Sequence, residues 1–136
     1  MAGLYFHIPF CKRICSYCDF FRVARLDRLG DVVEAMHKEL DEQRNFLNDR
    51  QISTIYFGGG TPSLLDPSEL QRFIDHAHQL FDTSQVSEIT AEMNPDDITA
   101  DSEKFSNRYD SYTDDKVTVL TYLYRNRETG TIWCCE

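Results

Sequence analysis

The hydrophobic and polar positions along the chain follow two alternating patterns, one typical of buried strands and one typical of amphipathic helices. Short apolar, aromatic and β-branched runs predict strands at residues 3–8, 52–57 and 86–93. Between them, apolar residues recur at helical spacing in two longer segments, at residues 27–47 and 67–81. This order of strand, helix, strand, helix and strand predicts an α/β fold in which right-handed crossovers join parallel strands.

The second predicted helix has the strongest start signal in the chain. Asp66 is a good capping residue, Pro67 suits the first helical position, and Glu69 follows three residues after the cap. The apolar stripe of this helix predicts core packing: Leu70, Phe73, Ile74, Ala77, Leu80 and Phe81. We therefore expect a structural helix that packs on the sheet.

The most unusual residues of the chain all follow predicted strands. Three cysteines come after the first strand, the run Gly58-Gly59-Gly60 ends the second, and Glu92 closes the third. In parallel α/β folds, ligands bind at the carboxyl ends of the strands. The sequence thus predicts a ligand site at this edge, although the glycine run taken alone also fits an ordinary turn from strand to helix.

The three cysteines, Cys11, Cys15 and Cys18, have the spacing C-x3-C-x2-C. Four-iron clusters usually take four cysteine ligands, so three thiolates would leave one iron open to a small molecule. Lys12 and Arg13 lie beside them in the sequence and would favour thiolates over thiols. A structural zinc site with His7 as the fourth ligand is the alternative, although zinc sites rarely combine these two spacings.

Composition and charge narrow the classes of function. The 136 residues suit one domain, no apolar run is long enough to span a bilayer, and we expect no signal peptide. The net charge of −9 disfavours nonspecific binding to nucleic acid or to anionic lipid. The five cysteines are an odd and clustered set, which argues against a secreted disulfide framework, and we expect reduced thiols in the cytoplasm.

Together, these motifs resemble the radical S-adenosylmethionine (SAM) superfamily, and within it the branch of HemW heme chaperones and oxygen-independent coproporphyrinogen III oxidases. The matching stretches agree in order and spacing, at residues 4–11, 11–18, 55–63 and 92–97. The resemblance implies that residues 1–101 form the βαβαβ beginning of a partial (β/α)6 barrel, in which six βα units surround the site.

The resemblance also implies a role for each matching residue. The three cysteines would bind irons of a [4Fe-4S] cluster, whose fourth iron would take the amino and carboxylate groups of SAM. One electron from the cluster would cleave a carbon–sulfur bond of SAM and release a 5′-deoxyadenosyl radical. The residues implied to contact SAM are Tyr5, Tyr17 against the adenine, Gly59, Gly60 and Thr61 near the methionine part, and Glu92 through its carboxylate.

One position separates the two relatives. The oxidase branch typically carries another cysteine two residues after the last cluster ligand, where this chain has Phe20. The sequence therefore favours the HemW branch, whose implied role is to bind heme and insert it into respiratory enzymes. Two alternatives stay open: an oxygen-independent coproporphyrinogen III oxidase of porphyrin biosynthesis, and a degenerate fragment that carries zinc or no cofactor.

After about Asp101 the resemblance ends, and residues 102–136 are interpreted as a divergent tail. Runs at 117–124 and 131–134 predict a β-hairpin. The adjacent Cys134 and Cys135 are expected to be incidental thiols, because neighbouring cysteines rarely face one ion together.

We expect such a chain to lack much of the catalytic barrel. Unpaired strand edges and a site open to water would follow, so we expect it to bind a cluster but to cleave SAM poorly. No catalytic residue is assigned, and His37, His76 and His78 are expected to be structural or solvated.

Overall fold

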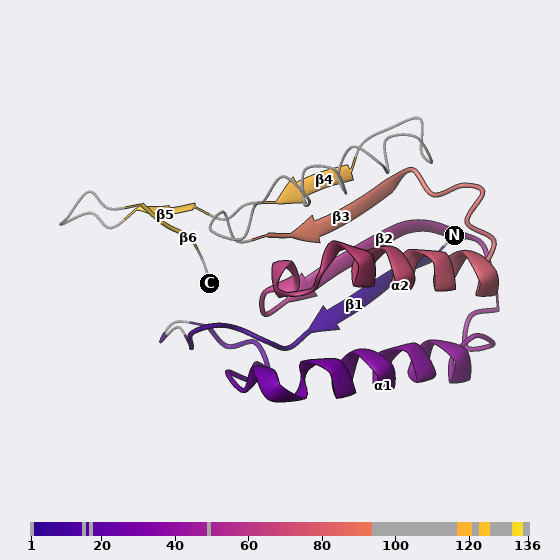
Figure 1. Cartoon of the computed structure of the whole chain (residues 1–136). Coiled ribbons are helices and arrows are strands. Elements are labelled where there is room, and N and C mark those ends of the chain that lie inside the picture. Colours follow the sequence, from indigo (N-terminus) through magenta and orange to yellow (C-terminus); the bar gives the residue numbers. More distant parts are fainter. Residues whose placement is uncertain are drawn as a thin grey trace.

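The computed structural model describes residues 2–14, 16, 18–48 and 50–93, together with the backbone of three short strands further along the chain. In this part of the chain the elements run in the order β1 (Ala2–Ile8), the 3₁₀ helix η1 (Leu26–Arg28), α1 (Leu29–Glu42), β2 (Ile52–Gly59), the 3₁₀ helix η2 (Pro62–Leu64), α2 (Pro67–Leu80), β3 (Glu88–Glu92), β4 (Val117–Leu120), β5 (Leu123–Arg125) and β6 (Ile132–Cys134). The alternation of strands and helices predicted from the sequence is confirmed (Figure 1).

Strands β1 to β4 form a parallel sheet in the order β1-β2-β3-β4. Tyr5 pairs with Tyr56, and Tyr56 in turn pairs with Thr90, so the carboxyl ends of the first three strands lie side by side. Helices α1 and α2 supply the crossovers that parallel pairing requires. The fold class is therefore the α/β class that the hydrophobic pattern predicted.

The hairpin predicted at residues 117–124 and 131–134 is present in a shorter form, because only the end of its first run pairs antiparallel with the second. Strand β4 lies parallel beside β3, with Val117 opposite Ile89. The antiparallel ladder joins β5 to β6 instead. The run 117–124 is thus divided between two sheets, because its first half makes backbone hydrogen bonds along the edge that β3 would otherwise leave unpaired.

Both α-helices pack on one face of the sheet, and the hydrophobic core lies between these two layers (Figure 1). Side chains alternate along β1, so that Phe6 and Ile8 are buried toward the helices while Tyr5 and His7 lie on the opposite face. The buried apolar residues that the helices contribute are Val33, Leu40, Leu70, Phe73, Ile74 and Ala77. The opposite face of the sheet carries the polar residues of the candidate site.

The two helix predictions differ in accuracy. Helix α2 begins where expected, with Pro67 as its first residue and the Asp66 carboxylate accepting the Ser68 backbone N–H at 2.8 Å. Helix α1 ends at Glu42 rather than near Leu47, since the residues after it form turns. Leu47 still packs against the core, which explains why the apolar pattern continues past the end of the helix.

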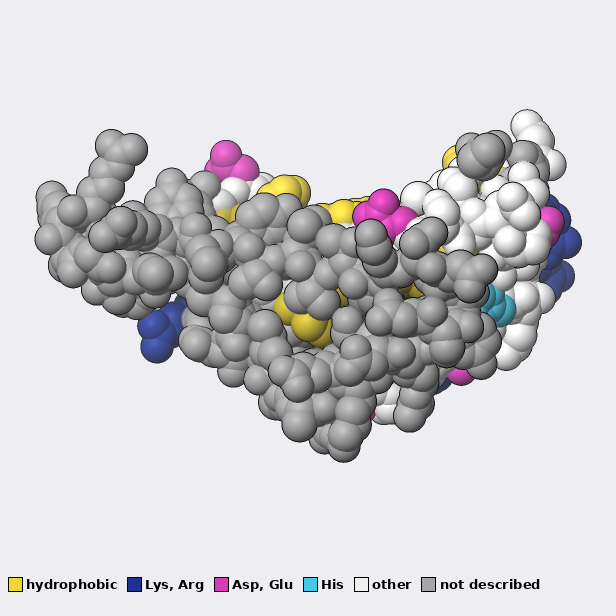
Figure 2. All heavy atoms as spheres, turned by 90° about the horizontal axis from the view of Figure 1, so that it is seen from above, with side chains coloured by type: hydrophobic (Ala, Val, Ile, Leu, Met, Phe, Trp, Pro, Cys, Tyr) yellow, Lys and Arg dark blue, Asp and Glu magenta, His cyan; other side chains and the backbone are white. Residues whose placement is uncertain are grey.

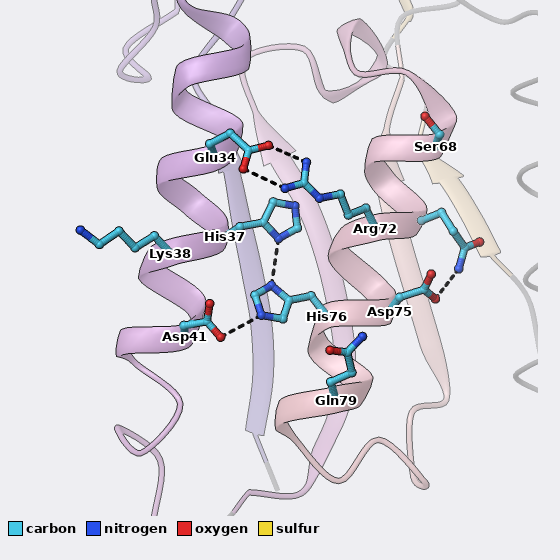
Figure 3. Close-up of a pocket in the computed structure, with 10 residues that line it drawn as sticks. Glu34, His37, Lys38, Asp41, Ser68, Arg72, Asp75, His76 and Gln79 are labelled. Carbon is cyan, nitrogen blue, oxygen red and sulfur yellow. Dashed lines mark hydrogen bonds and ion pairs between the residues drawn. The ribbon is translucent and has the colours of Figure 1, made fainter.

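A polar cluster joins α1 to α2 on the outer side of the helical layer (Figure 3). His37 is buried and stacks on Phe73 with ring centroids 4.0 Å apart, and its Nδ1 lies 2.9 Å from Nδ1 of His76. Burial lowers the pKa of His37, and the charges of Arg72 and His76 lower this pKa further. Arg72 also donates two hydrogen bonds to Glu34, at 2.6 and 2.9 Å. These contacts hold the two crossover helices together.

The surface carries charges of both signs. In the view from above (Figure 2), acidic and hydrophobic side chains both lie along the upper margin, and lysine and arginine side chains lie toward the two ends. The basic side chains coloured in this view are thus separated from one another. Within the described residues, no helix combines the length and the apolar character needed to cross a membrane.

Candidate functional site at the carboxyl ends of the strands

The glycine run after β2 packs directly on the chain that leads from β1 into the cysteine loop. The Gly60 N–H donates to the Ile8 carbonyl at 2.7 Å, and the Thr61 N–H donates to the Phe10 carbonyl at 2.7 Å. A Cβ atom at Gly60 would lie 2.5 Å from the Phe10 oxygen and 2.7 Å from the Ile8 oxygen. Glycine is required here because backbone atoms, which cannot move aside, occupy the space of a side chain.

Glu92 connects the ends of β2 and β3. Its Oε1 accepts the Tyr56 hydroxyl at 2.7 Å, and its Oε2 accepts the Gly59 N–H at 3.2 Å. Gly59 has φ of +109°, a conformation that L side chains rarely adopt. The N–H groups of Gly59, Gly60 and Thr61 are therefore all donated within the chain. What this run can offer to a ligand is its carbonyl oxygens, each of which has two lone pairs.

Tyr5 and His7, on the same face of β1, link this region to the cysteine loop. The His7 Nε2 lies 3.1 Å from the Phe21 carbonyl, which can only accept, so Nε2 carries the proton. In the neutral ring, Nδ1 is then bare and accepts the Tyr5 hydroxyl at 3.0 Å. Burial raises the pKa of Tyr5, and the charge of Glu92 raises this pKa further, so the tyrosine stays a protonated donor.

The base of the cysteine loop is held closed by backbone hydrogen bonds. The Cys11 N–H donates to the Val23 carbonyl at 3.1 Å, and the Val23 N–H donates to the Pro9 carbonyl at 2.6 Å. Arg22 donates to the carbonyl of Cys18, and so secures the end of the loop. Cys11 is buried and Cys18 is half-buried, and neither is in a disulfide. Cys11 and Cys18, two of the three predicted ligands, therefore belong to one closed loop beside the glycine run.

Two of the predicted site residues, Cys15 and Tyr17, lie outside the described residues. Among the residues that are described, no group of three or more His, Cys, Asp and Glu side chains is arranged to hold a metal ion. The donor set of the loop nevertheless fits an iron–sulfur cluster, because soft thiolates are its usual ligands.

The zinc alternative is weakened by the partners of His7. Both of its ring nitrogens are engaged, one with the Tyr5 hydroxyl and the other with the Phe21 carbonyl. A zinc ligand needs a bare ring nitrogen that points at the metal. His7 would have to break one of these hydrogen bonds in order to bind zinc.

Large apolar side chains surround the loop at the surface. Ile14, Phe20 and Phe21 are 59, 63 and 74% exposed. Apolar groups of this size gathered beside a polar site often mark a place where another molecule binds. The cysteine loop therefore presents an apolar rim next to its thiols.

The structure brings together some of the predicted residues and adds others. Gly59 and Glu92 are hydrogen bonded, and Gly60 and Thr61 contact the segment just before Cys11. Tyr56 was missed as a site residue, although strand alternation places it on the same face as Gly58, two positions along. The signal was therefore present, but a tyrosine in a strand is ordinarily assigned to packing.

Comparison with known proteins shows that the chain belongs to the Radical SAM superfamily, whose family model matches residues 5–119. This match continues past Asp101, where the resemblance was expected to end. The resemblance to this superfamily and the α/β fold that it implied are therefore both confirmed.

Among curated relatives, the heme chaperone HemW of Lactococcus lactis subsp. lactis (strain IL1403) is 39% identical over 94 residues, covering 69% of this chain and 24% of the relative. HemW of Escherichia coli (strain K12) is 37% identical over 101 residues, covering 73% of this chain and 27% of the relative. The oxygen-independent coproporphyrinogen-III oxidase-like protein HemZ of Bacillus subtilis (strain 168) is 32% identical over 132 residues, covering 92% of this chain and 26% of the relative.

Among solved structures, coproporphyrinogen III oxidase (HemN) from Escherichia coli, a radical SAM enzyme, superposes with a TM-score of 0.66 and 27% identity. The superposition covers 76% of this chain and 24% of that protein. The chain thus spans about a quarter of the length of the relatives that it matches.

Proposed function

We propose that this chain binds a [4Fe-4S] cluster and SAM and serves in heme handling, as a HemW-like protein. Cys11, Cys15 and Cys18 are the proposed cluster ligands. Tyr5, Tyr17, Gly59, Gly60, Thr61 and Glu92 are the proposed contacts to SAM. The observation that carries the proposal is the position of Glu92, whose carboxylate lies against the Gly59 N–H, while Gly60 and Thr61 dock beside Cys11.

The chemistry of these groups suits the amino group of SAM. An ammonium group donates hydrogen bonds and carries positive charge, and the Glu92 carboxylate together with glycine carbonyl oxygens supplies acceptors with complementary charge. When bound, the cluster supplies an electron to SAM. The role of this chain is to place the two groups next to each other.

The surrounding residues hold the cysteine loop and the strand ends in fixed positions relative to each other. His7 holds the Phe21 carbonyl, and the bonds of Gly60 and Thr61 fix the strand that precedes Cys11. The Tyr5 hydroxyl, whose pKa is raised by burial and by Glu92, holds the His7 ring in one tautomer. Preorganisation of this kind reduces the ordering cost when a ligand binds.

The heme part of the proposal rests on two observations. The relatives with 39 and 37% identity are heme chaperones by name. Phe20 and Phe21 expose apolar surface beside the loop, which suits the flat face of a porphyrin. A heme-accepting respiratory protein is then the proposed partner, and nucleic acid is not proposed as one. The proposed location is the cytoplasm, which the clustered cysteines support because thiols stay reduced there.

A second candidate is an oxygen-independent coproporphyrinogen III oxidase. The likeness to the Escherichia coli enzyme and to HemZ favours it. Phe20 stands where that branch carries a further cysteine, which favours the chaperone. An assay for decarboxylation of coproporphyrinogen separates the two, because a heme chaperone would leave this substrate unchanged.

Anaerobic iron–sulfide reconstitution tests the proposal. Electron paramagnetic resonance of the reduced protein is expected to show a [4Fe-4S] signal that shifts when SAM is added. Cys11→Ser and Cys18→Ser should abolish the cluster, and Cys134→Ser, outside the loop, should retain it. A colourless protein, or zinc in place of iron, would contradict the proposal, and heme titration of the reconstituted protein then tests heme binding separately.

A further inference from the structure

We infer that Tyr56 is a positioning residue that sets the specificity of the site for an ammonium-bearing ligand by fixing the Glu92 carboxylate against the glycine run. This inference rests on the proposed function, in which Glu92 contacts SAM. It adds a residue that lies within the matching stretch 55–63 but was given no role there, and that acts through another side chain.

The geometry around Glu92 distinguishes its two oxygens. Oε1 accepts the Tyr56 hydroxyl at 2.7 Å, and Oε2 accepts the Gly59 N–H at 3.2 Å. Tyr56 and Gly59 both belong to β2, and Glu92 is the last residue of β3. The carboxylate is therefore held at two points by one strand, which removes its freedom to rotate toward solvent.

The shorter of the two hydrogen bonds comes from Tyr56. Hydrogen bonds donated to a charged carboxylate are stronger than neutral ones, and O–H donors approach more closely than N–H donors. The Tyr56 hydroxyl is thus the main restraint on the direction of the Glu92 carboxylate. Each carboxylate oxygen has further lone pairs that can accept hydrogen bonds from a ligand.

The ring of Tyr56 is itself held in place. It packs 5.8 Å from the Tyr5 ring, centroid to centroid, and a Cβ atom at Gly58 would lie 2.6 Å from its Cε1. The absence of a side chain at Gly58 therefore makes room for the ring. A flexible carboxylate is in this way attached to a rigid aromatic group, which is how a site keeps its acceptors preorganised.

Tyr56→Phe tests the inference, because it keeps the ring and removes the hydroxyl. The affinity of the reconstituted, oxidised protein for SAM, measured by calorimetry, is expected to fall about five- to twentyfold. Glu92→Gln is expected to weaken binding at least as much. The double variant should bind no more weakly than Glu92→Gln alone, since Tyr56 acts through Glu92.

The NMR chemical shift of the Gly59 amide in the cluster-free protein is a second measurement. This shift would not change if Tyr56 only stabilised the fold. The Gly59 N–H donates to Glu92, and phenylalanine keeps the ring current of residue 56. A shift of the Gly59 amide in Tyr56→Phe therefore reports movement of the Glu92 carboxylate. Thr90→Val is the matched control, because it removes a hydroxyl that Thr90 donates to Glu88 at 2.5 Å on the same face of the sheet.

The outcomes separate the two claims. Weakened binding in Glu92→Gln beside unchanged binding and an unmoved Gly59 amide in Tyr56→Phe would overturn the inference and leave the proposed function intact. Unchanged binding in Glu92→Gln would overturn the assigned role of Glu92 and this inference with it. Weakened binding in both single variants, without further loss in the double variant, supports the inference.

Discussion

His37 of α1 and His76 of α2 face each other through their Nδ1 atoms, 2.9 Å apart (Figure 3). His76 also lies 2.9 Å through Nε2 from the Asp41 carboxylate, which only accepts, so that Nε2 carries a proton. The facing Nδ1 atoms have room for one proton between them. A proton on each would place two N–H groups against one another, which the pair cannot satisfy.

We predict that this pair makes the stability of the protein depend on pH. The pKa of His37 is lowered in the folded state, first by burial and then by Arg72 and His76, while Glu34 and Glu69 act in the opposite direction. Below the ordinary histidine pKa of about 6.5, the unfolded chain binds a proton that folded His37 resists. The free energy of unfolding is therefore expected to fall as the pH decreases below this value.

Urea unfolding between pH 7.5 and 5.5, above the titration of ordinary carboxylates, measures this effect. His37→Gln should flatten the pH dependence in this range. His78→Gln, at an exposed position on the same helix as His76, should leave it unchanged. An equal pH dependence in all three proteins would show that another group is responsible.

The second prediction concerns the contact of the glycine run with β1. Gly60→Ala would place a Cβ atom 2.5 Å from the Phe10 oxygen, so we expect the free energy of unfolding to fall by about 1–3 kcal/mol. Gly30→Ala is the control, since a Cβ there meets nothing within 4 Å in a helix, and it should stabilise the protein by about 0.5–1 kcal/mol. Equal stability of Gly60→Ala and the unmodified chain would contradict the close approach.

The third prediction concerns the link between His7 and the cysteine loop. His7→Ala removes the hydrogen bond to the Phe21 carbonyl, and Phe21 is 74% exposed. We expect faster chymotrypsin cleavage after Phe20 and Phe21, because the loop opens more often. His78→Ala should leave the cleavage rate unchanged, and equal rates in both variants would show that His7 does not hold the loop.

The fourth prediction concerns the start of α2. The Asp66 carboxylate accepts the Ser68 N–H at 2.8 Å and the Ser68 hydroxyl at 2.6 Å, and these bonds lower the pKa of Asp66. Asp66→Ala is expected to reduce the free energy of unfolding, measured by urea unfolding, whereas Asp66→Asn should retain most of the cap. A loss of equal size in both variants would point to the charge rather than to the hydrogen bond.

The sequence by itself determined the alternation of strands and helices, the start of α2 and the position of the candidate ligands at strand ends. These follow from local physics, because hydrophobic period, capping residues and glycine content act within a few positions of the chain. The sequence pattern predicted the end of α1 too far along the chain. Leu47 contacts the core from the segment after the helix, and so continues the apolar pattern beyond Glu42.

Only the tertiary structure decided which side chains become hydrogen-bond partners. The bond from Tyr56 to Glu92 joins residues 36 positions apart, and the pairing of His37 with His76 joins residues 39 apart. The parallel contact of β4 with β3 was likewise not predicted, and it limits the predicted hairpin to β5 and β6. Such contacts depend on strand register and helix packing, and a single chain read in order contains no local signal for either.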